Sequence, residues 1–89
     1  MDPDTVQKQL LDYIVEQRLE GDASGIDAST PLLAWGVLDS LSVVDLMAFI
    51  EQRFAVQVPA EQVTAQNLET LRSITELVMR VSGQHSAST

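Results

Sequence analysis

Ser40 is the residue of this sequence whose type and position most clearly suggest chemistry. The stretch Asp39-Ser40-Leu41 stands where a long polar loop gives way to an apolar run with helical spacing. Asp or Ser at such a junction caps a helix by accepting hydrogen bonds from its first backbone N–H groups. A hydroxyl there also lies near the positive end of the helix dipole, which tolerates an attached phosphate. The pattern therefore has two interpretations, a simple cap or a site of covalent modification.

Catalysis by Ser40 itself is disfavoured. A nucleophilic serine needs a neighbouring base, and the only histidine, His85, stands near the C-terminus. The G-x-S-x-G pattern is absent because Leu38 and Ser42 occupy the glycine positions, and Ser-x-x-Lys is absent because the only lysine is Lys8. The sequence also lacks a phosphate-binding Walker loop and a glycine-rich dinucleotide turn. We therefore expect a non-catalytic protein.

The charge balance restricts the possible partners. Thirteen Asp and Glu residues face five Lys and Arg residues in a chain of 89, for a net charge of −8. Such a chain repels nucleic acids and anionic membrane surfaces. The acidity either serves solubility alone or matches basic surfaces on partner proteins.

Length and residue usage indicate one small domain in a reducing compartment. There is no cysteine, no basic and apolar leader at the N-terminus, and no apolar stretch near the roughly 20 residues that span a bilayer. We expect a cytoplasmic monomer without a metal site.

Apolar periodicity and capping residues predict an all-α fold, a small four-helix bundle with three main helices and one short one. The first helix should run from Pro3 to Arg18 or Leu19, with Asp2 as its N-cap. The others are expected at Ser40–Phe54, just after Pro59, and from Leu71 to about Val81 with Thr70 as N-cap. Residues 54–58 show the alternating pattern of a β-strand, but no second strand is predicted to pair with them, so we expect a connector. The domain then covers residues 1–81, and residues 82–89 form a polar, disordered tail.

The segment 20–38 is predicted to be a long ordered loop. Its first part is rich in Gly, Asp, Ser and Pro, but five apolar residues make a disordered linker improbable: Ile26, Leu32, Leu33, Trp35 and Leu38. An EF-hand counted from Asp22 fails because Asp27 and Leu33 stand where Gly and Glu are required. We expect Trp35 to pin the loop to the core; a contact with a partner is the alternative.

The helix that begins at Ser40 carries two apolar faces. At about 100° per residue, one broad stripe faces the predicted core: Val43, Leu46, Met47, Ile50 and Phe54. A second, smaller stripe on the opposite side consists of Leu41, Val44 and Ala48. It is bordered by Asp45, Glu51 and Gln52. Either another part of the chain covers this second stripe, or partners dock on it.

Residues 36–46, G-V-L-D-S-L-S-V-V-D-L, resemble the attachment motif of acyl carrier and peptidyl carrier proteins. The resemblance extends over residues 5–81 and includes P-L-L before the motif, F-I-E-Q-R-F-A-V-Q-V-P after it and N-L-E-T-L-R-S-I-T-E-L-V near the end. It implies that Ser40 carries covalent 4′-phosphopantetheine from coenzyme A. It also implies that Asp39 is the acidic neighbour beside the cofactor and the metal of the transferase.

The resemblance further implies a set of partners. A phosphopantetheinyl transferase modifies the serine, a loading enzyme (an acyltransferase or an adenylating ligase) adds an acyl or aminoacyl group as a thioester, and a downstream synthase or transferase receives it. The positions that match the family's partner-facing side of this helix are Leu41, Val44, Asp45, Ala48 and Glu51.

Several positions depart from the best-known carrier subtypes. Ser42 stands where fatty-acid carriers commonly have an acidic residue, and Asp45 stands in place of Glu. Modular peptidyl carriers commonly have a Gly-Gly pair before the serine, whereas this chain has Val37 and Leu38 there. The pattern is more similar to free-standing carriers of polyketide or nonribosomal peptide pathways, which include antibiotic biosynthesis. A primary fatty-acid carrier and an unmodified helical adaptor are the alternatives.

Overall fold

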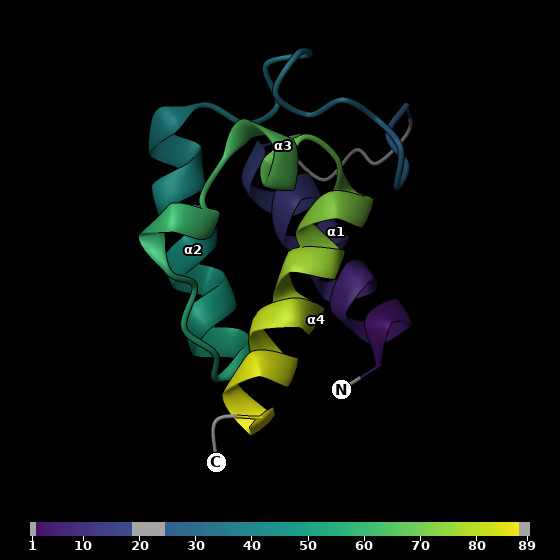
Figure 1. The fold of residues 1–89 in the computed structure, drawn as a ribbon. Coiled ribbons are helices and arrows are strands. Elements are labelled where there is room, and N and C mark those ends of the chain that lie inside the picture. The colour runs from purple at the N-terminus through teal and green to yellow at the C-terminus, as the bar shows by residue number, and fades with distance from the viewer. Residues whose placement is uncertain (1, 19–24, 88–89) are drawn as a thin grey trace.

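The computed structural model describes residues 2–18 and 25–87, and every regular element within these ranges is a helix. In chain order they are α1 (Pro3–Arg18), α2 (Ser40–Phe54), the 3-10 helix η1 (Ala60–Gln62), α3 (Ala65–Leu68) and α4 (Leu71–Ala87). The long helices are α1, α2 and α4, and Figure 1 shows short α3 near the end of the bundle that the loop crosses. The predicted all-α bundle is confirmed. In the described ranges no helix is long and apolar enough to cross a membrane.

The helices α1 and α4 form the centre of the bundle, and both follow the predicted pattern. The Asp4 N–H donates to Asp2 Oδ1 at 3.1 Å, which is the expected cap of α1. Val6, Leu10 and Ile14 recur every four residues and are completely buried where α1 packs against α4. The matching stripe of α4 is also buried: Leu71, Ile74, Leu77, Val78 and Val81. Thr70 caps α4 by accepting the Ser73 N–H at 3.1 Å.

The described part of the long loop is ordered by hydrogen bonds to the start of α4. The Leu32 N–H donates to the Glu69 carbonyl at 2.8 Å, and the Arg72 N–H donates to the Ala28 carbonyl at 3.0 Å. The Leu32 side chain is fully buried. These contacts confirm the expected ordered loop for its described residues 25–38, whereas residues 19–24, including Asp22, lie outside the described residues.

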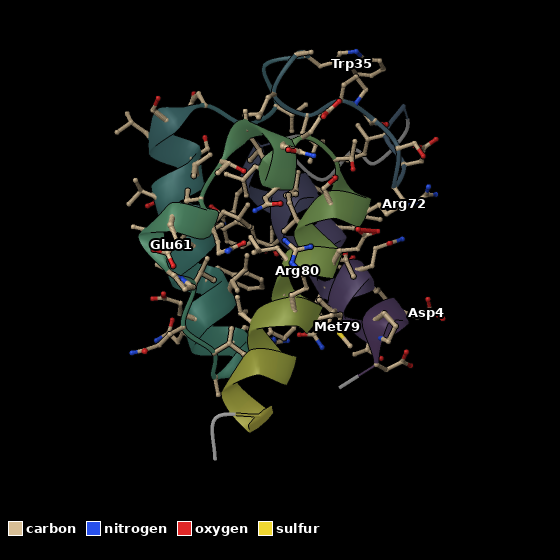
Figure 2. All side chains as sticks on the ribbon, in the orientation of Figure 1. Asp4, Trp35, Glu61, Arg72, Met79 and Arg80 are labelled. Atoms are coloured by element: carbon tan, nitrogen blue, oxygen red, sulfur yellow. The ribbon has the colours of Figure 1, made fainter. Side chains whose placement is uncertain are left out.

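The expectation that Trp35 pins this loop to the core is wrong. Its side chain is 61% exposed, and Figure 2 shows it at the outer edge of the loop. The Trp35 N–H closes a turn onto the Pro31 carbonyl, and Gly36 then adopts a positive φ of 76° that favours glycine. This turn directs Val37 and Leu38 inward, so these aliphatic side chains anchor the loop instead of the indole.

The last helix extends beyond its predicted end. We expected α4 to stop near Val81, but it continues to Ala87. Each added residue contributes one hydrogen bond once a helix has formed, and no proline interrupts this segment. Gly83 alone weakens it, by about 1 kcal/mol. Most of the expected disordered tail is therefore helical, while residues 88–89 lie outside the described residues.

The connection between α2 and α4 contains one helix that was predicted and one that was not. The short helix expected after Pro59 is η1, and residues 55–59 form the expected irregular connector. The unpredicted helix is α3, whose N-cap Thr64 accepts the Asn67 N–H at 3.2 Å. Four residues are too few to form a stable helix alone. Burial of Leu68 in the core is what holds α3 in place.

Candidate functional site

The start of α2 is fixed by two hydrogen bonds to one carboxylate oxygen. Asp39 has extended backbone angles, φ −135° and ψ −175°, and its Oδ1 accepts the Ser42 backbone N–H at 2.9 Å. The Ser42 hydroxyl donates to the same oxygen, also at 2.9 Å. The carboxylate therefore satisfies one of the backbone donors that every helix start leaves unpaired, and it complements the positive end of the dipole.

This cap gives the two neighbouring serines opposite environments. Ser42 is 6% exposed and is bonded to Asp39, whereas Ser40 is exposed at the first position of the helix. The backbone N–H of Ser40 is also among the donors without a partner inside the helix. The positive end of a helix stabilises a negatively charged phosphate, so the exposed Ser40 hydroxyl fits the attachment of 4′-phosphopantetheine.

The two faces of α2 are separated as the sequence predicts. On the inner side Leu46 and Ile50 are fully buried, and Val43, Met47 and Phe54 are partly buried against the core. On the outer side Leu41 is 81% exposed and Val44 is 66% exposed. The described part of the chain does not cover this second stripe.

The remaining predicted surface residues of α2 also lie on the outside. Ala48 and Asp45 are exposed. Glu51 is exposed as well, but its Oε2 accepts the Val58 N–H at 3.1 Å. Glu51 therefore tethers the connector that follows α2 in addition to placing a negative charge at the rim of the stripe.

A groove of about 550 Å³ opens beside Ser40. Its walls come from the loop, the first turns of α2, and α3 with the residues before it, and most of its lining is apolar: Leu33, Asp39, Ser40, Val43, Val44, Val63, Thr64, Ala65 and Leu68. A group attached to the hydroxyl of Ser40 thus has both open solvent and an apolar surface within reach.

The sequence interpretation missed three parts of this region. Ser42 donates its backbone N–H to the capping carboxylate of Asp39, and its position three residues after Asp39 could have predicted this bond. Phe49 stacks on Tyr13 with ring centroids 4.2 Å apart, a contact between α1 and α2 that no local pattern indicates. Helix α3 supplies one wall of the groove, and Thr64 was its only signal.

Comparisons with known proteins agree with this geometry. The family model described as "Phosphopantetheine attachment site" matches residues 9–78. The chain belongs to this family of phosphopantetheine-binding carrier proteins. Its cofactor is accordingly 4′-phosphopantetheine, and like other carriers it works with partner enzymes.

Two individual proteins illustrate the relationship. The chain is 30% identical over 76 residues to "Probable acyl carrier protein PigG" of Serratia sp. (strain ATCC 39006). The matched segment covers 85% of this chain and 87% of that protein. A solved structure gives a second match. The chain is similar to a chain in the structure described as "Crystal structure of FAD-dependent dehydrogenase", with a TM-score of 0.70 and 37% identity. That match covers 76% of this chain and 96% of the other, so the matched chain is of similar size to this carrier.

Replacement of Asp39 by alanine should destabilise the carrier by about 1–3 kcal/mol. The variant loses the helix cap and leaves the buried Ser42 hydroxyl without its acceptor. The free energy of unfolding in urea measures the effect.

Two controls make this prediction specific. Asp39→Asn keeps an oxygen that can accept both hydrogen bonds and should recover most of the stability. Asp45→Ala removes an exposed carboxylate from the same helix and should change stability by less than about 0.5 kcal/mol. Equal stability of Asp39→Ala and wild type would show that the cap does not hold the start of α2.

Proposed function

We propose that Ser40 is the attachment residue for 4′-phosphopantetheine and that the protein is a non-catalytic acyl or aminoacyl carrier. The single observation that supports this most is the exposed Ser40 at the capped start of α2, inside the segment that matches the family. When bound, the cofactor supplies a thiol, which this cysteine-free chain lacks and which holds carried groups as thioesters.

The chain's own residues present the serine but do not activate it. Asp39 Oδ1 already accepts two hydrogen bonds from Ser42 and is held in the cap. A serine hydroxyl needs a base to become a good nucleophile at neutral pH. We propose that the transferase supplies the base and most of the ligands of the magnesium ion, and that the carrier contributes an exposed hydroxyl in a fixed position.

Partner enzymes are proposed to dock on the outer stripe of α2. Leu41, Val44 and Ala48 offer a small apolar contact, and Asp45 and Glu51 provide negative charge at its rim. A carrier must leave one enzyme for the next, which suits a small contact with electrostatic steering. The net charge of −8 supports basic partner surfaces rather than nucleic acid or an anionic membrane, and we place the protein in the cytoplasm as a monomer.

The pathway is proposed to be one of specialised metabolism, making a polyketide or a nonribosomal peptide. Support comes from Ser42 and Asp45, which depart from the pattern of fatty-acid carriers.

One of the partners is proposed to be an FAD-dependent dehydrogenase that oxidises the carried group. The support is the carrier-sized chain in the structure of such an enzyme. In this reaction the carried group loses a proton and a hydride, and the flavin gains them.

Reconstitution of the loaded carrier with the dehydrogenase of its own pathway should lower the mass of the carried group by two hydrogens. An unchanged group with an active flavin enzyme would exclude this partner.

The attachment site can be tested by intact mass measurement after incubation with coenzyme A, magnesium and a broad-specificity phosphopantetheinyl transferase. Wild type and Ser42→Ala should each gain one phosphopantetheine, because Ser42 is buried, whereas Ser40→Ala should gain none. Modification of Ser40→Ala would show that another residue is the site. Absence of any modification on the wild type would favour the unmodified adaptor.

The docking surface is tested by Val44→Arg. Because Val44 is 66% exposed, the circular dichroism spectrum should not change. A cation in the apolar contact should lower kcat/KM for modification by the transferase about tenfold. Gln57→Arg adds the same charge at an exposed position of the connector and should have little effect. A collapsed fold, or equal losses in both variants, would contradict docking through this stripe.

A further inference from the structure

The exposure of Trp35 is explained neither by packing in the core nor by the stripe on α2. It is the only tryptophan of the chain, and 61% of its side chain is exposed. Tryptophan is usually well buried because of its large apolar surface. Among the described residues only two other large hydrophobic side chains are classed as exposed, Leu41 and Val44, and both lie in the proposed docking stripe.

Hydrogen bonds hold the backbone of the turn that carries this indole. The Trp35 N–H donates to the Pro31 carbonyl at 3.0 Å, and the Val37 N–H donates to the Leu32 carbonyl at 2.9 Å. Leu32 and Val37 are buried on either side of the turn. An aromatic side chain on such an ordered turn loses less entropy when it binds than one on a flexible loop.

The three exposed apolar side chains lie toward one end of the bundle. Figure 2 shows Trp35 on the loop that leads into α2, and Figure 1 shows that α2 begins at this end. Along the chain Ser40 stands between Trp35 and Leu41. Trp35 thus lies on the loop that leads directly into the helix start at Ser40.

This arrangement fits one partner better than the others. The transferase must bring its reacting atoms to the hydroxyl of Ser40 itself, and so it has to cover the surface around that residue. Later enzymes react with the thiol at the far end of the attached arm and need not cover the loop. Asp39 and Asp45 are exposed near the start of α2, so a basic surface complements this end. A lysine or arginine of that surface can also lie against the indole face.

We propose that Trp35 is a binding contact for the phosphopantetheinyl transferase, separate from the α2 stripe, and that it sets the efficiency with which Ser40 is modified. This inference rests on the proposed function of Ser40. Trp35 is a contact residue and takes no part in the chemical step. Its loss should therefore weaken binding and raise KM more than it lowers kcat.

The test uses fluorine NMR and modification kinetics. Fluorotryptophan incorporated into the whole carrier gives a single resonance, because the chain has one tryptophan. Addition of unlabelled transferase should shift or broaden it. Trp35→Ala should lower kcat/KM about tenfold, mainly through KM, as expected for an aromatic contact at an interface. Trp35→Phe should recover part of the loss, and Gln57→Ala, at a remote exposed position, should match wild type.

The outcomes separate this inference from the function on which it rests. Thermal unfolding of Trp35→Ala should match wild type, so that lost modification cannot reflect lost folding. A fluorine resonance that is unchanged at saturating transferase, or a Trp35→Ala variant modified at the wild-type kcat/KM, would overturn the inference alone. Failure to modify the wild type at all would overturn the proposed function and this inference with it.

Discussion

The hydrogen bonds that Asp39 accepts from Ser42 are the interaction on which the rest of the site depends. They fix the residue at which α2 begins, while the burial of Leu46 and Ile50 fixes which face of the helix points to the core. With this starting point Ser42 lies inside and Ser40 lies outside, in spite of their closeness in sequence.

The small size of the domain makes its exposed apolar residues informative. A chain of 89 residues has a limited core and has few apolar side chains to spare. The large apolar side chains of α1, α3 and α4 that the structure describes are buried or half-buried, while Leu41, Val44 and Trp35 stay at the surface. The fold gives up the burial of these three side chains, and the proposed contacts with partner enzymes would give a reason for their exposure.

Much of the fold could be predicted because its signals are local. Helix α2 spans the predicted range Ser40–Phe54, since a capping residue marks its start and two apolar stripes mark its faces. The errors came where tertiary structure decides. The burial of Leu68 stabilises α3, and the turn at Gly36 turns Trp35 outward although its hydrophobicity predicts burial. Neither effect can be read from propensity or periodicity, and the groove beside Ser40 depends on α3.

The central claim is that this fold displays one particular serine for attachment of the cofactor. The most direct measurement is peptide-level fragmentation mass spectrometry of the protein purified from its own host. Trypsin cleavage after Arg18 and Arg53 would place Ser40 and the buried Ser42 on one peptide, whose fragment ions distinguish the two positions. The account predicts phosphopantetheine on Ser40. The same group on Ser42 or on another serine, or a peptide that is never modified, would contradict it.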